Sequence, residues 1–343
     1  TPAERSTALT GARAGSPPGP ARPREHARRA DTVLVPWRST YLLPELAIQP
    51  RRCAAIQGLA QLSGNSTGVI GFDCVPITSS ETSAGGFPDA FARNLAAVAH
   101  FDVVAAISGA AAGEYRGWAR MLEGAGLTGP RVVEVPLPAQ APEPSAADLA
   151  AARARLTVPG LDMVLVVGSH EPRKNHLAVL HAAETAWRRG HRFSLVFVGG
   201  NAWGSEEFVG RLESLRSAGH PFESVSKMPD SQLWAAYRLA RFTAFPSLNE
   251  GFGLPVAESL SAGTPVLTSI YSSMRQLADE GGAVVVDPRD DADLAQAFER
   301  LLIDDELITR LAAEAAARPV RTWRDYAEET WAAMPTTRAG AAG

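Results

Sequence analysis

Short apolar runs alternate with longer amphipathic segments along the second half of the chain. Continuous runs of Val and Leu, such as Val164–Val167, are typical of strands that are covered on both faces, as in a parallel sheet. A helical pattern follows each run, so the pattern predicts a Rossmann-like α/β domain. Its strands are expected at Met163–Val167, Phe193–Val198, Glu223–Ser226, Phe242–Phe245, Pro265–Thr268 and Ala283–Val286.

The first half shows the same alternation in a shorter form. Leu42–Leu62 has the pattern of a helix that Pro44 and Pro50 interrupt. Further helical patterns span Pro88–His100 and Ala110–Leu122. A second, smaller α/β domain is therefore expected. Its β-prone runs are Asp31–Pro36, Gly68–Ile77, Val103–Ile107 and Arg131–Val135.

Composition marks the ends of these domains. Residues 1–30 are rich in Ala, Pro, Gly and charges, which predicts a disordered or poorly packed segment, and a first residue other than Met indicates processing or a fragment. Pro136–Ser145 has the composition of a linker, and Ser145 is expected to cap a helix that ends near Leu156. The expected division is a segment 1–30, domains 31–140 and 141–320, a helix 321–335 and a loose tail 336–343.

The stretch Phe245–Ser269 carries the first candidate chemistry. Pro246 ends a β-prone run, and Pro255 suits the first turn of a helix because that position needs no amide. The helix should begin near Leu254, and Gly263 should end it in a left-handed conformation. The stretch therefore reads as strand, loop, helix and strand.

Gly251 and Gly253 lie in the loop between that strand and that helix. The first amides of a helix carry partial positive charge, and glycines allow close approach to the backbone, so the loop predicts an anion site. Glu250 in the loop and Glu258 in the helix can accept hydrogen bonds from the hydroxyls of a sugar. A solvated acidic loop with a structural helix cap is the alternative interpretation.

This stretch resembles the signature of glycosyltransferase family 4, the retaining nucleotide-sugar enzymes of the two-domain GT-B fold. The resemblance lies in Glu250 and Glu258, with seven residues between them, and in the tail Gly-Phe-Gly-Leu-Pro-Val-Ala-Glu-Ser-Leu-Ser-Ala-Gly-Thr-Pro-Val. It implies that Glu258 binds the donor ribose and that Glu250 contacts the donor sugar near the reacting centre. The implied donor-binding loop comprises Gly251, Phe252, Gly253 and Leu254, the last two through amides to the diphosphate.

Arg173 and Lys174 follow the first strand of the second domain, in the segment Gly168–Asn175. Loops at the carboxyl ends of parallel strands border the ligand crevice, so this pair should point at the same cleft as Glu250. A basic pair at a helix start opposes the helix dipole, so an anionic partner is expected; a solvated basic helix start is the alternative. The run Glu-Pro-Arg-Lys-Asn is also close to the family pattern, which implies that both cations stabilise the leaving diphosphate. His170 is expected at the surface, with a contact to the sugar as the alternative interpretation.

Weaker signals come from the first domain and from one later turn. Asp73 lies where the family has a His-Asp pair, which implies a catalytic contact, but Phe72 replaces the histidine; a strand-end turn residue is the alternative. Ser108 matches a strand-end serine of the family that meets a phosphate or acceptor, although capping the next helix is the plainer role. Lys227 and Met228 lie in a turn that cups the nucleotide base in the family.

Charge and composition narrow the partners. The 33 basic and 37 acidic residues give a formal net charge of -4 with mixed signs, which argues against a nucleic-acid binder. Cys53 and Cys74 are too few for a disulfide scaffold, and no apolar run approaches the ~18 residues of a membrane span. A cytoplasmic protein is therefore expected, with a peripheral place at the inner membrane face as an option. Asp290 and its acidic neighbours are expected to cap a helix, so no metal and no cofactor besides the donor is expected.

The combined interpretation is a retaining glycosyltransferase that moves a sugar from a nucleotide-diphosphate donor, such as GDP-mannose or UDP-glucose, to a hydroxyl acceptor in glycan or glycolipid synthesis. The alternatives are an epimerase or phosphorylase of the same fold and a non-catalytic nucleotide-sugar-binding scaffold. The four expected strands of the first domain are fewer than a complete GT-B domain has, and the helix 321–335 resembles the family helix that crosses back to the first domain. A cluster around Trp118, with Tyr115, Arg116 and Arg120, suits either anionic lipid or core packing.

Overall fold

A computed structural model describes residues 36–335. The compact unit that begins at Arg38 holds all the helices and strands below. The expected loose segments 1–30 and 336–343 lie outside the described residues, as does the β-prone run at residue 31 except for Pro36. Across the described part of the chain, no helix is long and apolar enough to cross a membrane.

The first sheet has four parallel strands in the order β1-β2-β3-β4. Helices α3 (Pro50–Leu62), α5 (Phe87–Val98) and α6 (Gly109–Gly124) connect them, with the short α4 (Val75–Thr78) and the 3₁₀ turn η1 (Ser80–Thr82) after β2. Buried apolar side chains of these helices and of the strands form one core cluster. The strands are β1 (Thr40–Leu43), β2 (Ser66–Gly71), β3 (Val103–Ala106) and β4 (Arg131–Glu134).

Two sequence-based boundaries in this sheet are wrong. Leu42 and Leu43 belong to β1 and not to a helix, because a residue before proline, here Pro44, is held in extended conformation. Helix α3 begins only at Pro50, which occupies its first turn. The strand expected to reach Ile77 ends at Gly71, since the following residues turn into α4.

The second sheet has six parallel strands in the order β10-β9-β8-β5-β6-β7. The predicted α/β architecture with parallel sheets is therefore confirmed. The strand order reverses where β5 and β8 lie side by side, and ligands of such sheets bind outside the carboxyl ends of the strands at this point. The strands are β5 (Asp162–Val167), β6 (Phe193–Val198), β7 (Phe222–Val225), β8 (Phe242–Phe245), β9 (Val266–Ser269) and β10 (Ala283–Val286).

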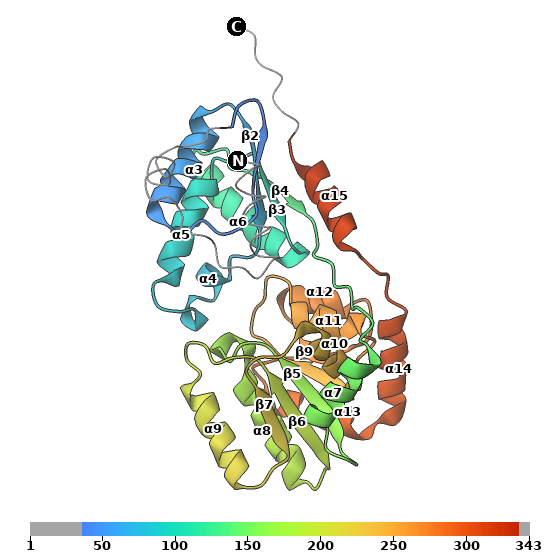
Figure 1. The fold of residues 1–343 in the computed structure, drawn as a ribbon. Coiled ribbons are helices and arrows are strands. Elements are labelled where there is room, and N and C mark those ends of the chain that lie inside the picture. Colours follow the sequence, from blue (N-terminus) through green and yellow to red (C-terminus); the bar gives the residue numbers. More distant parts are fainter. Residues whose placement is uncertain (1–35, 336–343) are drawn as a thin grey trace, which may run out of the picture. The chain divides into compact units, whose positions relative to one another are not determined.

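Helices cover both faces of this sheet (Figure 1). Side chains of β5 alternate: Val164 and Val166 join the core under α8 (His176–Arg188), α9 (Glu206–Ser217), α13 (Asp291–Ile303) and α14 (Asp305–Ala316). Met163 and Leu165 join the core under α7 (Ala146–Leu156) and α10 (Asp230–Leu239). Helices α11 (Leu254–Ser261) and α12 (Ser272–Ala278) follow β8 and β9. Burial on both faces explains the continuous apolar runs of the strands.

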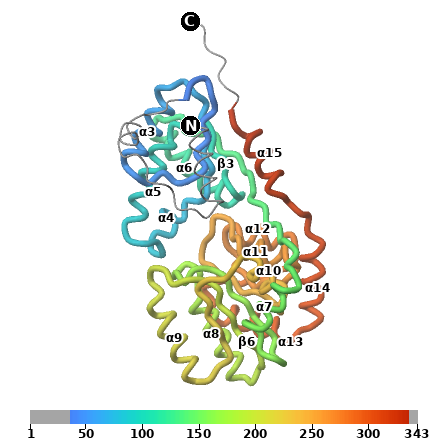
Figure 2. The backbone as a smooth tube through the Cα atoms, viewed as in Figure 1, coloured from blue at the N-terminus to red at the C-terminus, as the bar shows by residue number. Residues whose placement is uncertain are grey.

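The backbone passes between the two sheets twice, as the tube in Figure 2 shows. The first passage is the segment after β4, which contains no helix or strand up to Ser145. The second joins α14 to α15 (Trp323–Ala333), and Arg321 Nε of this passage donates to the carbonyl of Pro136 in the first at 2.8 Å. Helix α15 packs on the first sheet through Tyr326, which is buried with Val103 of β3.

The aromatic residues of this terminal helix differ in burial. Trp323 and Trp331 are exposed, and only Tyr326 is buried in the core. The i, i+3 spacing does bring Trp323 and Tyr326 into an edge contact with ring centroids 5.9 Å apart. In α6, by contrast, Tyr115 is buried and Trp118 packs against the same core, so the core-packing interpretation of that cluster is confirmed for its aromatic residues.

Candidate active site

Two loops meet at the point where the strand order reverses. The loop after β5 contains the 3₁₀ turn η2 (Pro172–Lys174), and the loop after β8 runs from Pro246 to Gly253. The carbonyl of Arg173 accepts hydrogen bonds from the amide of Leu248 and from Ser247 Oγ, both at 2.9 Å. Asn175, in the left-handed conformation, donates from its side chain to the carbonyl of Pro246 at 3.2 Å. These bonds fix one loop on the other.

The charged side chains of the two loops converge. Arg173 Nη1 and Lys174 Nζ lie 2.6 Å from the two carboxylate oxygens of Glu250. Arg173 Nη2 also lies 2.8 Å from Oε1 of Glu171. The side chains of Arg173 and Lys174 are only 16% and 12% exposed, so the interpretation of a solvated basic helix start is wrong. Their anionic partners in this structure are carboxylates of the chain itself.

Glu250 is ionised although it is buried. Burial alone would raise its pKa, but the charges of Lys174 and Arg173 and a 2.7 Å hydrogen bond from Ser247 more than offset burial, so the pKa of Glu250 is lowered. The hydroxyls of Ser272 and Ser273 donate to its backbone carbonyl at 2.8 and 2.9 Å. Ser272 has φ 56, an uncommon conformation for a residue other than glycine, and such strain concentrates at functional sites.

Helix α11 begins beside this cluster. Leu254 is its first residue, as the sequence predicts, and Pro255 lies in its first turn. Gly253 precedes the helix with φ 87, a conformation that favours glycine. The first amides of a helix have no acceptor within the helix, so this end of α11 can bind an anion. Gly263 ends the segment with φ 77, as predicted.

Glu258 lies one turn into α11 but outside the ion cluster. Its Oε2 accepts a 2.7 Å hydrogen bond from the hydroxyl of Tyr237, a fully buried residue of α10. Burial raises the pKa of Glu258, although the hydrogen bond from Tyr237 opposes this. Met228 packs against the core cluster that contains Tyr237, whereas Lys227 is exposed. Nothing in the sequence near Glu258 indicates Tyr237, because an amphipathic pattern does not specify which helical residue meets a distant carboxylate.

Asp73 and Ser108 approach the same loop from the first sheet. A side chain at position 251 would collide with Asp73 and with the carbonyl of Phe72, so Gly251 permits this approach. Ser108 Oγ donates to the carbonyl of Gly251 at 2.5 Å and accepts from the amide of Ala111 at 3.0 Å. Ser108 therefore caps α6, as predicted, and contacts the loop as well.

The environment of Asp73 differs from that of Glu250. Burial, reinforced by the negative charge of Glu114, raises the pKa of Asp73 to about 6, although the charge of Arg173 acts in the opposite direction. Its Oδ1 accepts a 3.1 Å hydrogen bond from the amide of Val75 at the start of α4. The side chain of Phe252, expected among the donor-binding residues, is buried in the core cluster of the first sheet.

Two histidines beside the loop are buried, so the expectation of a surface His170 is wrong. His170 Nδ1 lies 2.8 Å from Asn201 Oδ1, and its ring packs on that of Phe208 with centroids 4.5 Å apart. Burial lowers the pKa of His176 to about 3, so this ring is neutral. An apolar setting among aromatic rings explains why a polar residue beside a loop is not solvated.

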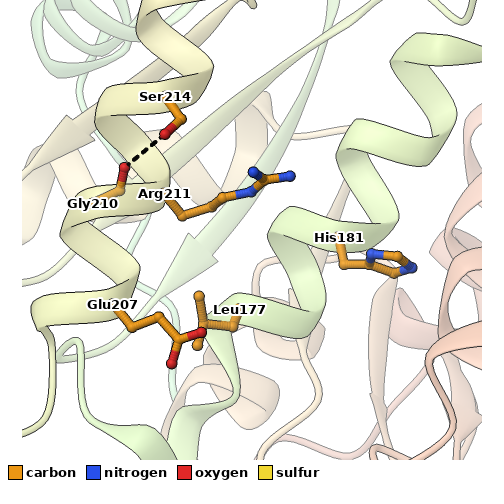
Figure 3. A pocket seen from close by; sticks show the side chains of 6 residues that line it. All are labelled: Leu177, His181, Glu207, Gly210, Arg211 and Ser214. Carbon is orange, nitrogen blue, oxygen red and sulfur yellow. Dashed lines mark hydrogen bonds between the residues drawn. The ribbon is translucent and has the colours of Figure 1, made fainter.

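Another cleft lies away from this site, between α8 and α9 (Figure 3). It encloses about 450 Å³ and is lined by Leu177, His181, Glu207, Gly210, Arg211 and Ser214. Arg211 forms an ion pair with Glu184, so its charge is already balanced. None of the residues that the sequence singles out for chemistry lines this cleft. Helix α13 packs on α8 over the same face of the sheet, and Asp290 caps α13 by accepting from the amides of Ala292 and Asp293, as predicted.

Known proteins are similar in sequence to the half of the chain that contains Arg173, Lys174 and Glu250. A family model described as glycosyl transferases group 1 matches residues 151–318. The O-antigen chain mannosyltransferase B of Escherichia coli is 30% identical over 168 residues, which are 48% of this chain and 44% of that protein. A D-inositol 3-phosphate glycosyltransferase of Acidothermus cellulolyticus is 36% identical over 184 residues, 51% of this chain and 41% of the relative.

The alignments thus span less than half the length of these curated relatives. Solved structures extend the likeness beyond the group 1 domain. The sucrose-phosphate synthase of Thermosynechococcus elongatus superimposes with a TM-score of 0.67 at 19% identity, over 90% of this chain and 75% of the other. Anabaena HepE, solved with UDP-glucose, superimposes with a TM-score of 0.64 at 16% identity. This superposition covers 80% of this chain and 72% of HepE. At such identities the likeness shows the fold, and the predicted GT-B architecture is confirmed.

Proposed function

We propose that this protein transfers a sugar from a nucleotide-diphosphate donor to a hydroxyl acceptor, with retention of the anomeric configuration, in glycan or glycolipid synthesis. One observation carries the proposal: Arg173 and Lys174 both reach Glu250 at 2.6 Å where the strand order of the second sheet reverses. The family of residues 151–318 supports it. HepE with UDP-glucose and the mannosyltransferase of Escherichia coli make UDP-glucose and GDP-mannose the first donors to examine.

The cation pair would bind the diphosphate. When the bond between the anomeric carbon and the diphosphate oxygen breaks, negative charge grows on the leaving group, and fixed cations lower that barrier. Without a donor, Glu250 and Glu171 neutralise the two cations. The incoming diphosphate would share the cations with these carboxylates, and the backbone at the start of α11 would add amides from Gly253 and Leu254.

The two glutamates would hold the remaining parts of the donor. Glu250 is ionised and can accept hydrogen bonds from the hydroxyls of the transferred sugar. Tyr237 holds one oxygen of Glu258 and leaves the other for the ribose hydroxyls. Lys227 and Met228 would contact the base through their backbone. The two free, buried cysteines, Cys53 and Cys74, agree with the cytoplasmic location that we propose.

The variants Glu250→Gln and Lys174→Ala test this function with a panel of nucleotide sugars and sugar acceptors. Each variant should lose roughly 10²- to 10³-fold in transfer, the typical effect of removing one preorganised electrostatic contact. The matched controls are Glu329→Gln and Arg324→Ala on the surface of α15, which should keep wild-type activity. Near-wild-type transfer in both site variants would refute the assignment.

The products of the same assay separate the alternative functions. Retention is established when the anomeric proton of the isolated glycoside shows the configuration of the donor. A free epimer or a sugar phosphate would indicate an epimerase or a phosphorylase. Donor binding without hydrolysis or transfer to any acceptor would indicate a non-catalytic binder, an alternative that the replacement of histidine by Phe72 motivates.

A further inference from the structure

A cavity of about 170 Å³ adjoins the cation pair, between Arg173 on one side and the segment after β2 on the other. We propose that this cavity binds one uncharged sugar ring of the acceptor and that Trp203 is the main residue that selects it. The inference rests on the proposed function and adds the class of acceptor. Pockets for drug-sized ligands enclose about 300–1,000 Å³, so this volume suits a single ring rather than a longer chain.

Aromatic side chains form much of the wall. Phe72, Phe87, Phe91 and Trp203 all line the cavity. The C–H faces of a pyranose ring are apolar, and aromatic rings offer large apolar surfaces at a low cost in conformational entropy. Phe72 stands where the family pattern has histidine, so an apolar ring replaces a polar one at this wall. The wall therefore favours stacking on a sugar ring over hydrogen bonding to it.

The polar part of the lining disfavours an anionic acceptor. Asp73 contributes a carboxylate, and an ionised carboxylate accepts hydrogen bonds from hydroxyls but repels a phosphate. Among the described residues that line the cavity, Arg173 is the one cation. Its guanidinium already lies 2.6 Å from Glu250 and 2.8 Å from Glu171. An uncharged polyol ring is the ligand that this set of groups suits best.

One hydrogen bond of its own and two features of its loop hold Trp203 at the cavity. Its Nε1 donates to the carbonyl of Thr82 at 2.9 Å. Gly204, with φ 68, has no side chain and so allows the loop to lie close against Pro172, the neighbour of Arg173. Three residues before Trp203, the carbonyl of Gly200 accepts a hydrogen bond from the amide of His170 at 2.8 Å. The loops that carry Trp203 and Arg173 are thus tied together, and the ring has a fixed place relative to the cation.

Saturation-transfer NMR measures this binding directly, with full-length protein saturated with UDP or GDP. The probes are methyl α-mannopyranoside and methyl β-glucopyranoside, compared with mannose 6-phosphate and glucose 6-phosphate. We expect the neutral glycosides to bind at least tenfold more tightly than the hexose phosphates. Trp203→Ala should weaken glycoside binding about tenfold, and Trp203→Phe, which keeps a ring but loses the bond to Thr82, should fall between. Asp73→Asn should narrow the difference between neutral and phosphorylated probes.

The control is Trp331→Ala, which removes an exposed tryptophan of α15 and should bind the glycosides as the wild type does. Preference for the hexose phosphates, equal binding by Trp203→Ala and wild type, or no saturation transfer to either glycoside would each overturn the inference. Calorimetry with UDP and GDP separates this result from the proposed function. Nucleotide binding without glycoside binding contradicts only the acceptor pocket, whereas loss of nucleotide binding in the wild type contradicts the function itself.

Discussion

Three carboxylates at the site have different protonation behaviour because their neighbours differ. Glu250 has two cations within 2.6 Å, and its pKa is lowered in spite of burial. Asp73 is buried near the negative charge of Glu114, and its pKa rises to about 6. The pKa of Glu258 is raised by burial. Groups whose environments separate their pKa values usually perform different roles, so we expect Glu250 to stay ionised where Asp73 begins to take up a proton.

This difference gives a prediction for stability. The folded state holds the proton of Asp73 up to about pH 6, whereas the unfolded chain releases it near the ordinary value of 3.8. The folded state therefore loses stability through Asp73 as the pH rises from about 4 to about 6, by at most ~3 kcal/mol. Asp73→Asn removes this loss. In urea unfolding, the free energy of unfolding of the variant should therefore rise relative to that of the wild type between about pH 4 and about pH 6.

The surface carboxylate of Asp89 provides the control, because Asp89→Asn changes an exposed ion pair with Arg93 that contributes little. Its unfolding free energy should follow the wild type at every pH. If the curves of Asp73→Asn and wild type run parallel from pH 4 to pH 7, the carboxyl of Asp73 titrates normally and its burial has no energetic effect.

At this scale the sequence predicts the charged residues better than their partners. Arg173, Lys174 and Glu250 stand in recognisable local runs, and the structure brings them together. The bonds that Tyr237 and Ser272 make to the glutamate segments come from other elements of the fold. No local pattern indicates them, since they depend on how helices and strands pack.

At the scale of elements, the site depends on close contact between the loops after β5 and β6. A side chain at position 199 would collide with the backbone carbonyl of Gly168, while Gly200 has ordinary space around its Cα. Gly199 thus allows the first loop, with its cation pair, to lie against the second, which carries Trp203. The contact therefore explains the glycine at position 199, whereas position 200 has room for a side chain.

Gly199→Ala should therefore be destabilising by about 1–3 kcal/mol, the usual cost of overpacking, and should displace the cation pair. Gly200→Ala is the matched control and should change the unfolding free energy by under about 1 kcal/mol. Chemical unfolding and nucleotide binding measure the two effects. Equal behaviour of the two variants would show that the loops can separate without consequence.

Elements were predictable where proline and glycine fix the backbone, as at the start of α11 at Leu254 and its end at Gly263. The prediction fails where residues fit a helical apolar pattern but a following proline holds the backbone extended. Leu42 and Leu43 fit a helical pattern, but Pro44 holds the chain extended and the pair joins β1. Apolar periodicity does not weigh such a steric restriction, so the strand was missed.

At the scale of the whole chain, α15 joins the end of the described sequence to the first sheet. Thr322 begins it with a capping box: its Oγ1 accepts from the amide of Asp325 at 3.2 Å, and Asp325 Oδ2 accepts from the amide of Thr322 at 2.8 Å. Tyr326 and Met334 are buried with Val103 of β3. The helix therefore stabilises a sheet whose strand β3 precedes it by more than two hundred positions.

Loss of this cap should loosen the helix. Thr322→Ala should cost about 1 kcal/mol, and hydrogen exchange should accelerate in α15 and in β3, which it covers. Thr309→Ala is the control on the exposed surface of α14. It removes a threonine hydroxyl that donates to the carbonyl of Asp305 in the same helix, and it should leave hydrogen exchange in β3 unchanged. Equal exchange of β3 in the two variants would mean that α15 does not protect the first sheet.

The double passage of the backbone between the sheets, linked by Arg321 and Pro136, has a topological consequence. The segment after β4 joins the two halves covalently, and the passage into α15 joins them a second time through the packing of that helix on the first sheet. Movement of one half relative to the other is therefore restricted to displacements that both connecting segments allow, such as rotation about an axis through the two segments. A protease that cuts the segment after β4 would produce two chains without a covalent link, and the packing of α15 on β3 would still hold them together.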